Sequence, residues 1–311
     1  MRWKKLGIVY SPDGSQPWAR SHAMIPTPLR LDQSVIRVFV TCCDNKGIGR
    51  PGYVDVLASD PTQMVAVTEA PMLDLGEPGT FDENGVLLCS VVDAGDGNWN
   101  MYYVGFELGE KIRYRLLTGL AQSRDGGRTF ARISRTPVLE RSDSELYFRG
   151  GPCCLKEHGR YRMWYVAGSN WIDVEGKSMP VYDIRYAESE DGVHWPSEGT
   201  VQIPITEPDE HGFGRPYVIP KPGGGYRMFY SVRRRSLRAY RLGYAESQDG
   251  HVWQRMDDRL NLDVTPGGFD SDAIMYAAPV QVGRPVRTSR TPARSAVPTV
   301  TVRDTGSMPS T

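Results

Sequence analysis

A five-residue pattern that recurs four times constrains the fold of this 311-residue chain more than any other feature. Each copy alternates apolar or aromatic residues with other residues, which is the pattern of a β-strand. The copies occupy residues 36–40, 99–103, 161–165 and 226–230, so successive copies begin 62 to 65 residues apart. A period of this length, with several short strands in each unit, is typical of the blades of a β-propeller.

A second repeated element follows each copy of the pattern and predicts a tight turn. Three copies end in Ser-x-Asp-Gly, at residues 120–126, 186–192 and 244–250, and the first unit has a weaker version at 57–61. The Asp side chain can accept backbone N–H groups of the turn, and Gly tolerates a positive φ. An aromatic residue comes shortly afterwards in three units (Phe130, Trp195 and Trp253), and we expect it to hold the turn against its blade.

A third element, an aromatic residue leading into a β-prone run, occurs five times and sets the predicted domain boundaries. It places blade starts near residues 18, 81, 148, 213 and 269. We therefore predict an all-β fold, a five-bladed β-propeller over residues 1–283, with the last blade incomplete because no further strand pattern follows. The β-prone residues 6–10 are expected to supply the outer strand of that blade. Residues 284–311, rich in Arg, Pro, Ser and Thr and free of aromatic residues, predict a disordered or aberrant tail.

Composition narrows the classes of partner and compartment. The 37 basic and 37 acidic residues balance, which excludes a globally basic nucleic-acid binder. No apolar run approaches the roughly 18 residues of a membrane span. Five cysteines in a poorly spaced set predict no disulfide framework, and the start of the sequence lacks the pattern of a signal peptide, so we expect a cytoplasmic location. No metal ion or other cofactor is predicted, and the oligomeric state is left open.

Candidate site residues follow from propeller geometry, because the first strand of each blade lines the central channel. Polar residues near the starts of these strands should therefore meet at one end of the channel, and loops 43–52, 106–116, 167–182 and 231–240 should form the rim of that end. The candidates are Arg20, His22, Asp82, Glu83, Asn84, Glu145, Arg149, Arg215, Asp270 and Asp272, with Trp171 from the rim. Structural roles are the alternative for several of them: Asp82 could cap a turn, and Arg149 and Arg215 could form ion pairs that join blades.

The blade pattern Tyr-Arg-Met-Trp-Tyr followed by Tyr-Ala-Glu-Ser-x-Asp-Gly resembles that of the five-bladed propeller glycosidases, which include glycoside hydrolase families 32, 43, 62, 68 and 130. The resemblance covers about residues 18–283. It implies cleavage or transfer of a glycosidic bond by two carboxyl groups. The catalytic candidates are then Asp82, Glu83, Glu145, Asp270 and Asp272, and the substrate-binding candidates are Arg20, His22, Asn84, Arg149, Arg215 and Trp171.

The match to these enzymes is partial, and three functions stay open. The first blade offers Arg20 and His22 but no acid, which weakens the case for plain hydrolysis. The arginines suit an anionic or phosphorylated sugar, and they also suit a phosphorylase of the mannoside type that uses inorganic phosphate. The third possibility is a non-catalytic propeller that binds a sugar or a protein. The expected ligand is a carbohydrate or a sugar phosphate.

Overall fold

The computed structural model describes residues 1–282, and strands dominate them. The first two groups of strands are β1 (Ser21–Arg30), β2 (Val35–Cys43), β3 (Gly49–Leu57) and β4 (Met64–Val67), then β5 (Val86–Gly95), β6 (Asn98–Leu108), β7 (Tyr114–Ser123) and β8 (Ala131–Arg132). The next two are β9 (Phe148–Glu157), β10 (Arg160–Val174), β11 (Lys177–Ser189) and β12 (Thr200–Ile203), then β13 (Glu210–Pro220), β14 (Tyr226–Arg234), β15 (Leu237–Ser247) and β16 (Trp253–Arg255). The 3₁₀ helix η1 (Asp257–Arg259) follows.

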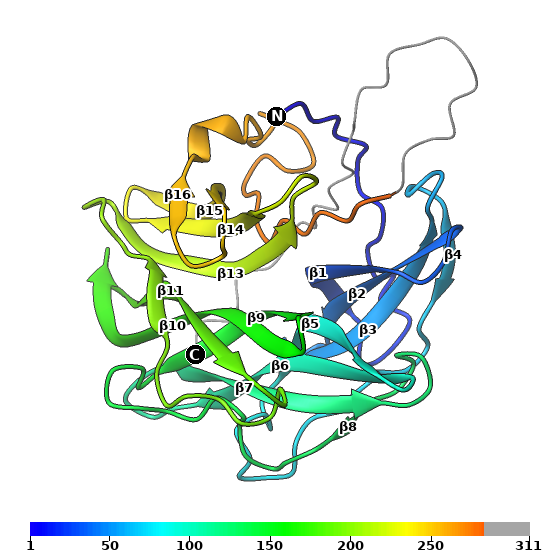
Figure 1. Cartoon of the computed structure of the whole chain (residues 1–311), viewed down its shortest axis with the longest axis horizontal. Coiled ribbons are helices and arrows are strands. Elements are labelled where there is room, and N and C mark those ends of the chain that lie inside the picture. The colour runs from blue at the N-terminus through cyan, green and yellow to red at the C-terminus, as the bar shows by residue number, and fades with distance from the viewer. Residues whose placement is uncertain (283–311) are drawn as a thin grey trace.

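The strands form four antiparallel units that surround a common centre. Within each unit, every strand pairs with the next in sequence, from β1 to β4, β5 to β8, β9 to β12 and β13 to β16. Short parallel contacts join β7 to β9 and β11 to β13, so the third strand of one unit contacts the first strand of the next. Figure 1 shows the four units, here called blades 1 to 4, arranged around the middle of the molecule. The predicted all-β, propeller-like fold is confirmed for residues 1–282.

The five-residue repeat packs its alternate side chains against different neighbours. Its fourth residue faces the next blade: the Tyr102 hydroxyl donates to Gly192 O (2.8 Å) and Trp164 Nε1 donates to Gly250 O (3.1 Å). Both acceptors belong to Ser-x-Asp-Gly turns, in which Asp191 and Asp249 accept backbone N–H groups. The predicted turns are therefore confirmed. The turns also join neighbouring blades, since each one contacts the preceding blade, and the local sequence does not reveal this contact.

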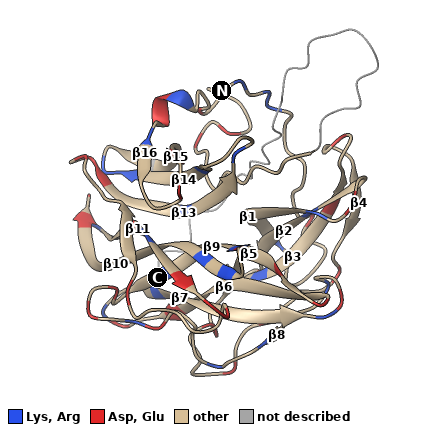
Figure 2. Ribbon diagram, viewed as in Figure 1, with Lys and Arg blue, Asp and Glu red and all other residues tan. Residues whose placement is uncertain are grey.

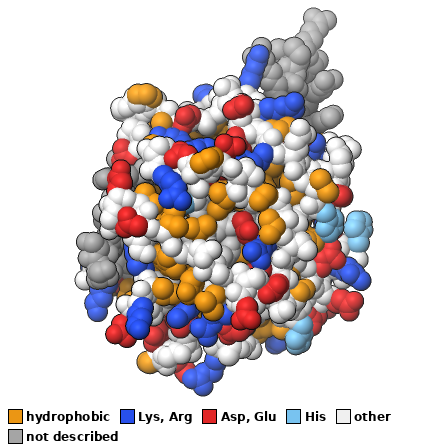
Figure 3. All heavy atoms as spheres, turned by 90° about the vertical axis from the view of Figure 1, so that its left-hand side faces the viewer, with side chains coloured by type: hydrophobic (Ala, Val, Ile, Leu, Met, Phe, Trp, Pro, Cys, Tyr) orange, Lys and Arg blue, Asp and Glu red, His pale blue; other side chains and the backbone are white. Residues whose placement is uncertain are grey.

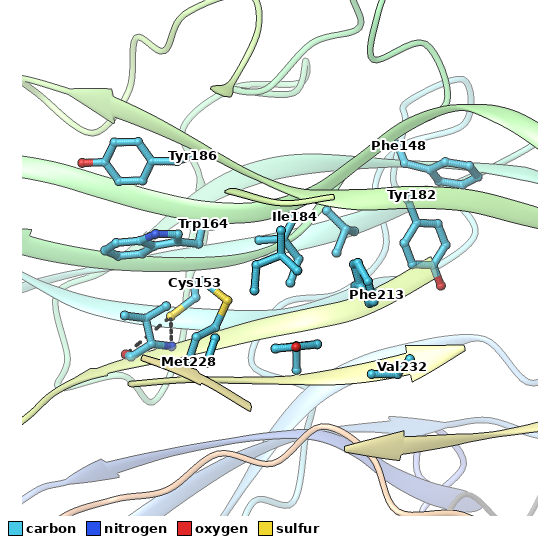
Figure 4. Packing of buried hydrophobic residues seen from close by; sticks show 14 residues of the cluster. Phe148, Cys153, Trp164, Tyr182, Ile184, Tyr186, Phe213, Met228 and Val232 are labelled. Carbon is cyan, nitrogen blue, oxygen red and sulfur yellow. Dashed lines mark hydrogen bonds between the residues drawn. The ribbon is translucent and has the colours of Figure 1, made fainter. Parts of the chain in front are cut away.

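The core between blades 3 and 4 runs from these turns to the opposite end of the strands. Figure 4 shows Trp164 and Tyr186 at one end of this core and Phe148 and Tyr182 at the other. Phe213 lies near the second pair, and its side chain is fully buried. Period-2 alternation explains this arrangement, since every second residue of a strand points to the same face. On the outer face shown in Figure 3, acidic and basic side chains are mixed around apolar ones, and neither sign dominates.

The gap between blades 4 and 1 is filled by residues 1–14 together with residues 257–282, in which the structure has no β-strand. Trp3 Nε1 donates to Leu260 O (2.6 Å), and the Trp3 ring contacts Phe229 edge-on. Further along, Val9 and Val280 both pack against the blade 1 core. The expectation of an outer strand at residues 6–10 is wrong: this stretch is irregular and exposes Leu6 and Ile8, because it crosses between two blades instead of pairing along one. The predicted tail, residues 284–311, lies outside the described residues.

Candidate functional site

Each of the four channel-lining strands carries a β-bulge at a corresponding place. The register shifts between Met24 and Thr27, between Leu88 and Ser90, between Gly150 and Cys153 and between Gly214 and Tyr217. A bulge leaves an extra residue unpaired and re-aims its backbone. Positive φ angles accompany the bulges at Ile25 and Arg215, and two more occur at His22 and Tyr276. Such conformations are costly for residues other than glycine, so the surrounding structure must hold them in place.

Arg215 crosses the channel and bonds to backbone groups that these bulges present. Its Nη1 donates to Pro26 O (2.9 Å), and its Nη2 donates to Cys89 O (2.9 Å) and to the Thr27 hydroxyl (2.7 Å). The side chain is 3% exposed. Arg215 thus links blade 4 to blades 1 and 2 at the axis. The substrate-binding role predicted for it is not what these contacts support, because its terminal nitrogens already serve the fold.

Asp82 and Glu145 lie inside blades, and each belongs to a tyrosine–carboxylate–arginine arrangement that recurs in blades 2, 3 and 4. Asp82 accepts hydrogen bonds from the Tyr103 hydroxyl (2.9 Å) and from Arg132 Nε (2.8 Å). Glu145 accepts one from the Tyr165 hydroxyl (2.8 Å) and forms ion pairs with two arginines, Arg149 and Arg185 (2.5 and 3.1 Å). The corresponding Tyr230 of blade 4 donates to Asp257 (2.8 Å). In each case the last tyrosine of the five-residue repeat meets a carboxylate that an arginine neutralises.

Two further predicted residues are also engaged in the interior. Arg149 is 1% exposed, and besides Glu145 it donates to Glu140 O (2.7 Å) and Pro196 O (3.0 Å). Asp270 is buried next to the N-terminal segment, where Lys5 Nζ donates to it (2.5 Å). Burial alone would raise the pKa of Asp270, but the bonds from Lys5 and Thr265 outweigh burial and lower it. Asp82 in blade 2, the Glu145–Arg149 pair in blade 3 and Asp270 beside the N-terminal segment are therefore each engaged by a different part of the fold.

The remaining predicted residues lie at the end of the channel where the first strands begin, here called the mouth. Glu83 and Asn84 directly precede β5 and are half-buried; Glu83 accepts the Gly79 N–H (2.7 Å) and an Asn84 Nδ2–H (3.3 Å). His22 is half-buried in β1, with its Nδ1 2.8 Å from the Ser21 hydroxyl. Exposed residues at this end are Arg20, which donates to Gly14 O, and Asp272. Within residues 1–282 no cluster of His, Cys, Asp and Glu is arranged to hold a metal ion.

The structure adds an arc of aromatic rings at the mouth, here called the aromatic arc. The arc passes from blade 2 through blades 3 and 4 to the segment after η1, with neighbouring ring centres 5.2 to 6.1 Å apart or hydroxyls in contact. Its members are Phe106, Tyr114, Phe148, Trp171, Tyr182, Tyr240 and Tyr276. Only Trp171 among them was a predicted site residue. The signal that could have identified more is the tyrosine in each of the rim loops 106–116, 167–182 and 231–240, which the propeller geometry already placed at the mouth.

Hydrogen bonds and a charge give the aromatic arc its polar character. The hydroxyls of Tyr182 and Tyr240 are 3.0 Å apart, and Arg233 Nε donates to the Tyr240 hydroxyl (2.5 Å). Burial raises the pKa of Tyr182 well above its ordinary value, so this phenol stays protonated and can donate. Trp171 Nε1 is buried and has no hydrogen-bond acceptor among the described residues. Figure 2 shows basic and acidic segments spread over all blades, so this local arrangement, and not the overall charge, distinguishes the mouth.

No protein-family model matches the sequence, but a curated relative does. The uncharacterized protein Rv1502 of Mycobacterium tuberculosis is 33% identical over 276 residues, which is 89% of this protein and 90% of Rv1502. The protein MT1551, from another strain of that species, matches to the same extent and is likewise uncharacterized. Neither relative carries a stated activity, so they establish kinship without establishing function.

Solved structures with similar folds include glycoside hydrolases and a complex of BT0996 with RGII. A thermostable family-43 glycoside hydrolase matches with a TM-score of 0.60 and 16% identity, over 87% of this protein and 82% of the hydrolase. BT0996 in a complex with RGII matches with a TM-score of 0.65 and 16% identity, over 89% of this protein and 84% of BT0996. At this level of identity the likeness concerns the fold alone. The protein belongs to the family of the mycobacterial protein Rv1502, and its fold is that of the propeller glycoside hydrolases.

Proposed function

We propose that the protein is a carbohydrate-active enzyme that binds its glycan at the aromatic arc and acts on a glycosidic bond. The observation that carries the proposal is the convergence of aromatic side chains from three blades and the following segment at the channel mouth. The half-buried rings of the arc can offer apolar faces to sugar rings, and a tyrosine hydroxyl can offer a donor; these rings are Phe106, Tyr114, Trp171 and Tyr276. The propeller glycosidase fold and the RGII complex among the structural neighbours support a carbohydrate ligand. We also propose that residues 1–14 and 257–282 together take the place of a fifth blade.

Glu83 becomes the leading catalytic carboxylate in this proposal. It stands at the mouth, whereas Asp82 beside it points into blade 2 and pairs with Arg132. Among the described residues Glu83 makes no ion pair, and its bonds from Gly79 and Asn84 orient the carboxylate without neutralising it. A carboxyl group there can give a proton to the leaving oxygen, or as carboxylate can activate water or phosphate. Asp272, in the segment 257–282 that follows blade 4, is the proposed second acid.

A non-catalytic, sugar-binding propeller is the second candidate function. It is favoured by the ion pairs that engage Asp82, Glu145 and Asp270, three of the five carboxylates expected to act in catalysis. This reading needs the same aromatic arc but predicts no product. A cytoplasmic location stays a prediction under both readings, and cell fractionation would check it.

Turnover and binding assays separate the two candidates. The purified protein is incubated with a panel of aryl glycosides and oligosaccharides, with and without inorganic phosphate, and its glycan binding is measured on the same panel. We expect Glu83→Gln to lower turnover at least 100-fold while glycan binding persists, and the exposed Glu190→Gln to serve as a charge-matched control. Product formed only with phosphate identifies a phosphorylase. Binding without product supports the second candidate, and absence of glycan binding, with Trp171→Ala indistinguishable from wild type, contradicts both.

A further inference from the structure

Arg233 is a half-buried arginine at the mouth of the channel. It lies near the end of β14, opposite Gly212 of β13, and Gly212 in turn pairs with Tyr182 of β11. A Cβ on Gly212 would come within 3.1 Å of the Tyr182 ring, so the missing side chain lets the tyrosine and the arginine approach each other. The guanidinium carbon of Arg233 stands 4.6 Å from the centre of the Tyr240 ring. Arg233 is thus built into the aromatic arc.

The guanidinium of Arg233 has unused donors and no counter-charge among the described residues. Its one hydrogen bond to a described residue runs from Nε to the Tyr240 hydroxyl, out of the five N–H donors that a guanidinium carries. No described carboxylate forms an ion pair with it. At several other enclosed arginines the fold supplies a carboxylate: Arg37 pairs with Asp55, Arg132 with Asp82, Arg149 with Glu145, and Arg255 with Glu210 and Asp257. Arg113, Arg215 and Arg227 also form no ion pair with a described carboxylate, but Arg215 donates three hydrogen bonds across the channel, and Arg113 and Arg227 are not part of the aromatic arc.

The surroundings of Arg233 suit an oxyanion. The Tyr240 hydroxyl accepts a hydrogen bond from Arg233 Nε, and the Tyr182 hydroxyl lies 3.0 Å from that of Tyr240. In the Tyr182–Tyr240 pair one hydroxyl donates to the other, which leaves one phenol proton to donate to an incoming acceptor. A partly enclosed cation without a partner is unfavourable, and an anion held by two N–H groups in a fork removes that cost.

We propose that Arg233 binds an oxyanion carried by the glycan, a carboxylate or a phosphate, with one hydroxyl of the Tyr182–Tyr240 pair donating a further hydrogen bond to it. This inference rests on the proposed carbohydrate function. It assigns to Arg233 the anion-binding role that the sequence suggested for Arg149 and Arg215, because the guanidinium groups of those two residues are bonded within the fold. The ligand class is therefore an acidic sugar, such as a uronic acid or a sugar phosphate.

The test compares two Arg233 variants with a matched control. Wild type, Arg233→Gln, Arg233→Lys and Arg235→Gln are applied to an array of neutral, uronic-acid-containing and phosphorylated oligosaccharides, and each is titrated with inorganic phosphate by calorimetry. Arg235 is exposed two residues away, so its variant removes the same charge without touching the arc. Thermal melts of all four proteins check folding. We expect Arg233→Gln to weaken acidic-glycan binding by about 10- to 100-fold, the size of a charge-assisted hydrogen bond, and Arg233→Lys to weaken it less.

The outcomes separate the anion site from the carbohydrate function. Preference for uronic acids identifies a carboxylate ligand, and preference for phosphorylated glycans identifies a phosphate. If neutral glycans bind as tightly as acidic ones and Arg233→Gln changes nothing, the inference is overturned while the carbohydrate function stands. If no glycan binds but phosphate binding is lost in Arg233→Gln alone, the anion site stands and the carbohydrate function fails. An equal loss in Arg235→Gln would also overturn the inference, since it would show a general charge effect.

Discussion

Replacing Asp82 by Asn tests whether this carboxylate stabilises blade 2 or takes part in chemistry. Asp82 is 1% exposed and accepts hydrogen bonds from Tyr103, Thr80 and Arg132. Breaking a fully buried ion pair by removing one charge costs about 3 to 5 kcal/mol. The Arg132 side chain is 20% exposed and recovers part of its hydration, so we expect a loss of about 2 to 3 kcal/mol in the free energy of unfolding.

The assay is thermal unfolding followed by circular dichroism, combined with a double-mutant cycle. For a domain of this size, about 2 to 4 °C is lost per kcal/mol, so the Asp82→Asn variant should melt roughly 5 to 10 °C below wild type. Arg132→Met should cost a similar amount, and the double variant should cost less than the sum of the two, because the charges are coupled. An unchanged melting temperature together with lost glycoside turnover would refute the structural assignment and return Asp82 to the catalytic site.

Two further predictions concern the closure of the ring. Arg215→Met should lower the free energy of unfolding by about 3 kcal/mol or more, because it leaves the carbonyls of Pro26 and Cys89 without their donor at the axis; denaturant titration measures it, and Arg160→Met, an exposed arginine, should change little. The pKa of Asp270 is lower in the folded protein than in the unfolded chain. Its ion pair with Lys5 therefore contributes fully to stability at pH values above the ordinary carboxyl pKa of about 4. That contribution is lost as the pH falls through the folded-state pKa. Lys5→Met should therefore lower the melting temperature at pH 7 by a few degrees and leave it nearly unchanged near pH 2, whereas equal losses at both pH values would contradict this account.

Much of the fold was predictable because it depends on local patterns that repeat. Alternation within residues 99–103 and 161–165 identifies strands without knowledge of their neighbours, and an Asp-Gly pair identifies a turn by its backbone requirements. The closure between blades 4 and 1 was less predictable. Trp3 and Val9 sit in an irregular segment whose position follows from contacts with Phe229 and the blade 1 core, more than 200 and about 30 residues away. Such contacts leave no periodic signal.

The candidate site shows where sequence reasoning stops. Arg149 and Arg215 both follow the aromatic residue that starts a blade, and the sequence suggested a shared role for them. Arg149 is one residue after Phe148, and Arg215 is two residues after Phe213. Because a strand alternates its faces, one position of offset is enough to send Arg149 into blade 3 with Glu145 and Arg215 across the channel.

The sequence alone determined that this protein forms β blades with Asp-Gly turns, because those features depend on residues close together in the sequence. Only the tertiary structure decided which charged side chains form ion pairs and hydrogen bonds inside the fold and which lie at the mouth. The bulges at Ile25 and Arg215 change which side of the strand faces the axis, and neutralising partners such as Arg132 for Asp82 come from distant strands. Arg233 is left without a carboxylate partner among the described residues for the same reason: its surroundings are built from four separate segments of the sequence, and charge balance there is a property of their packing.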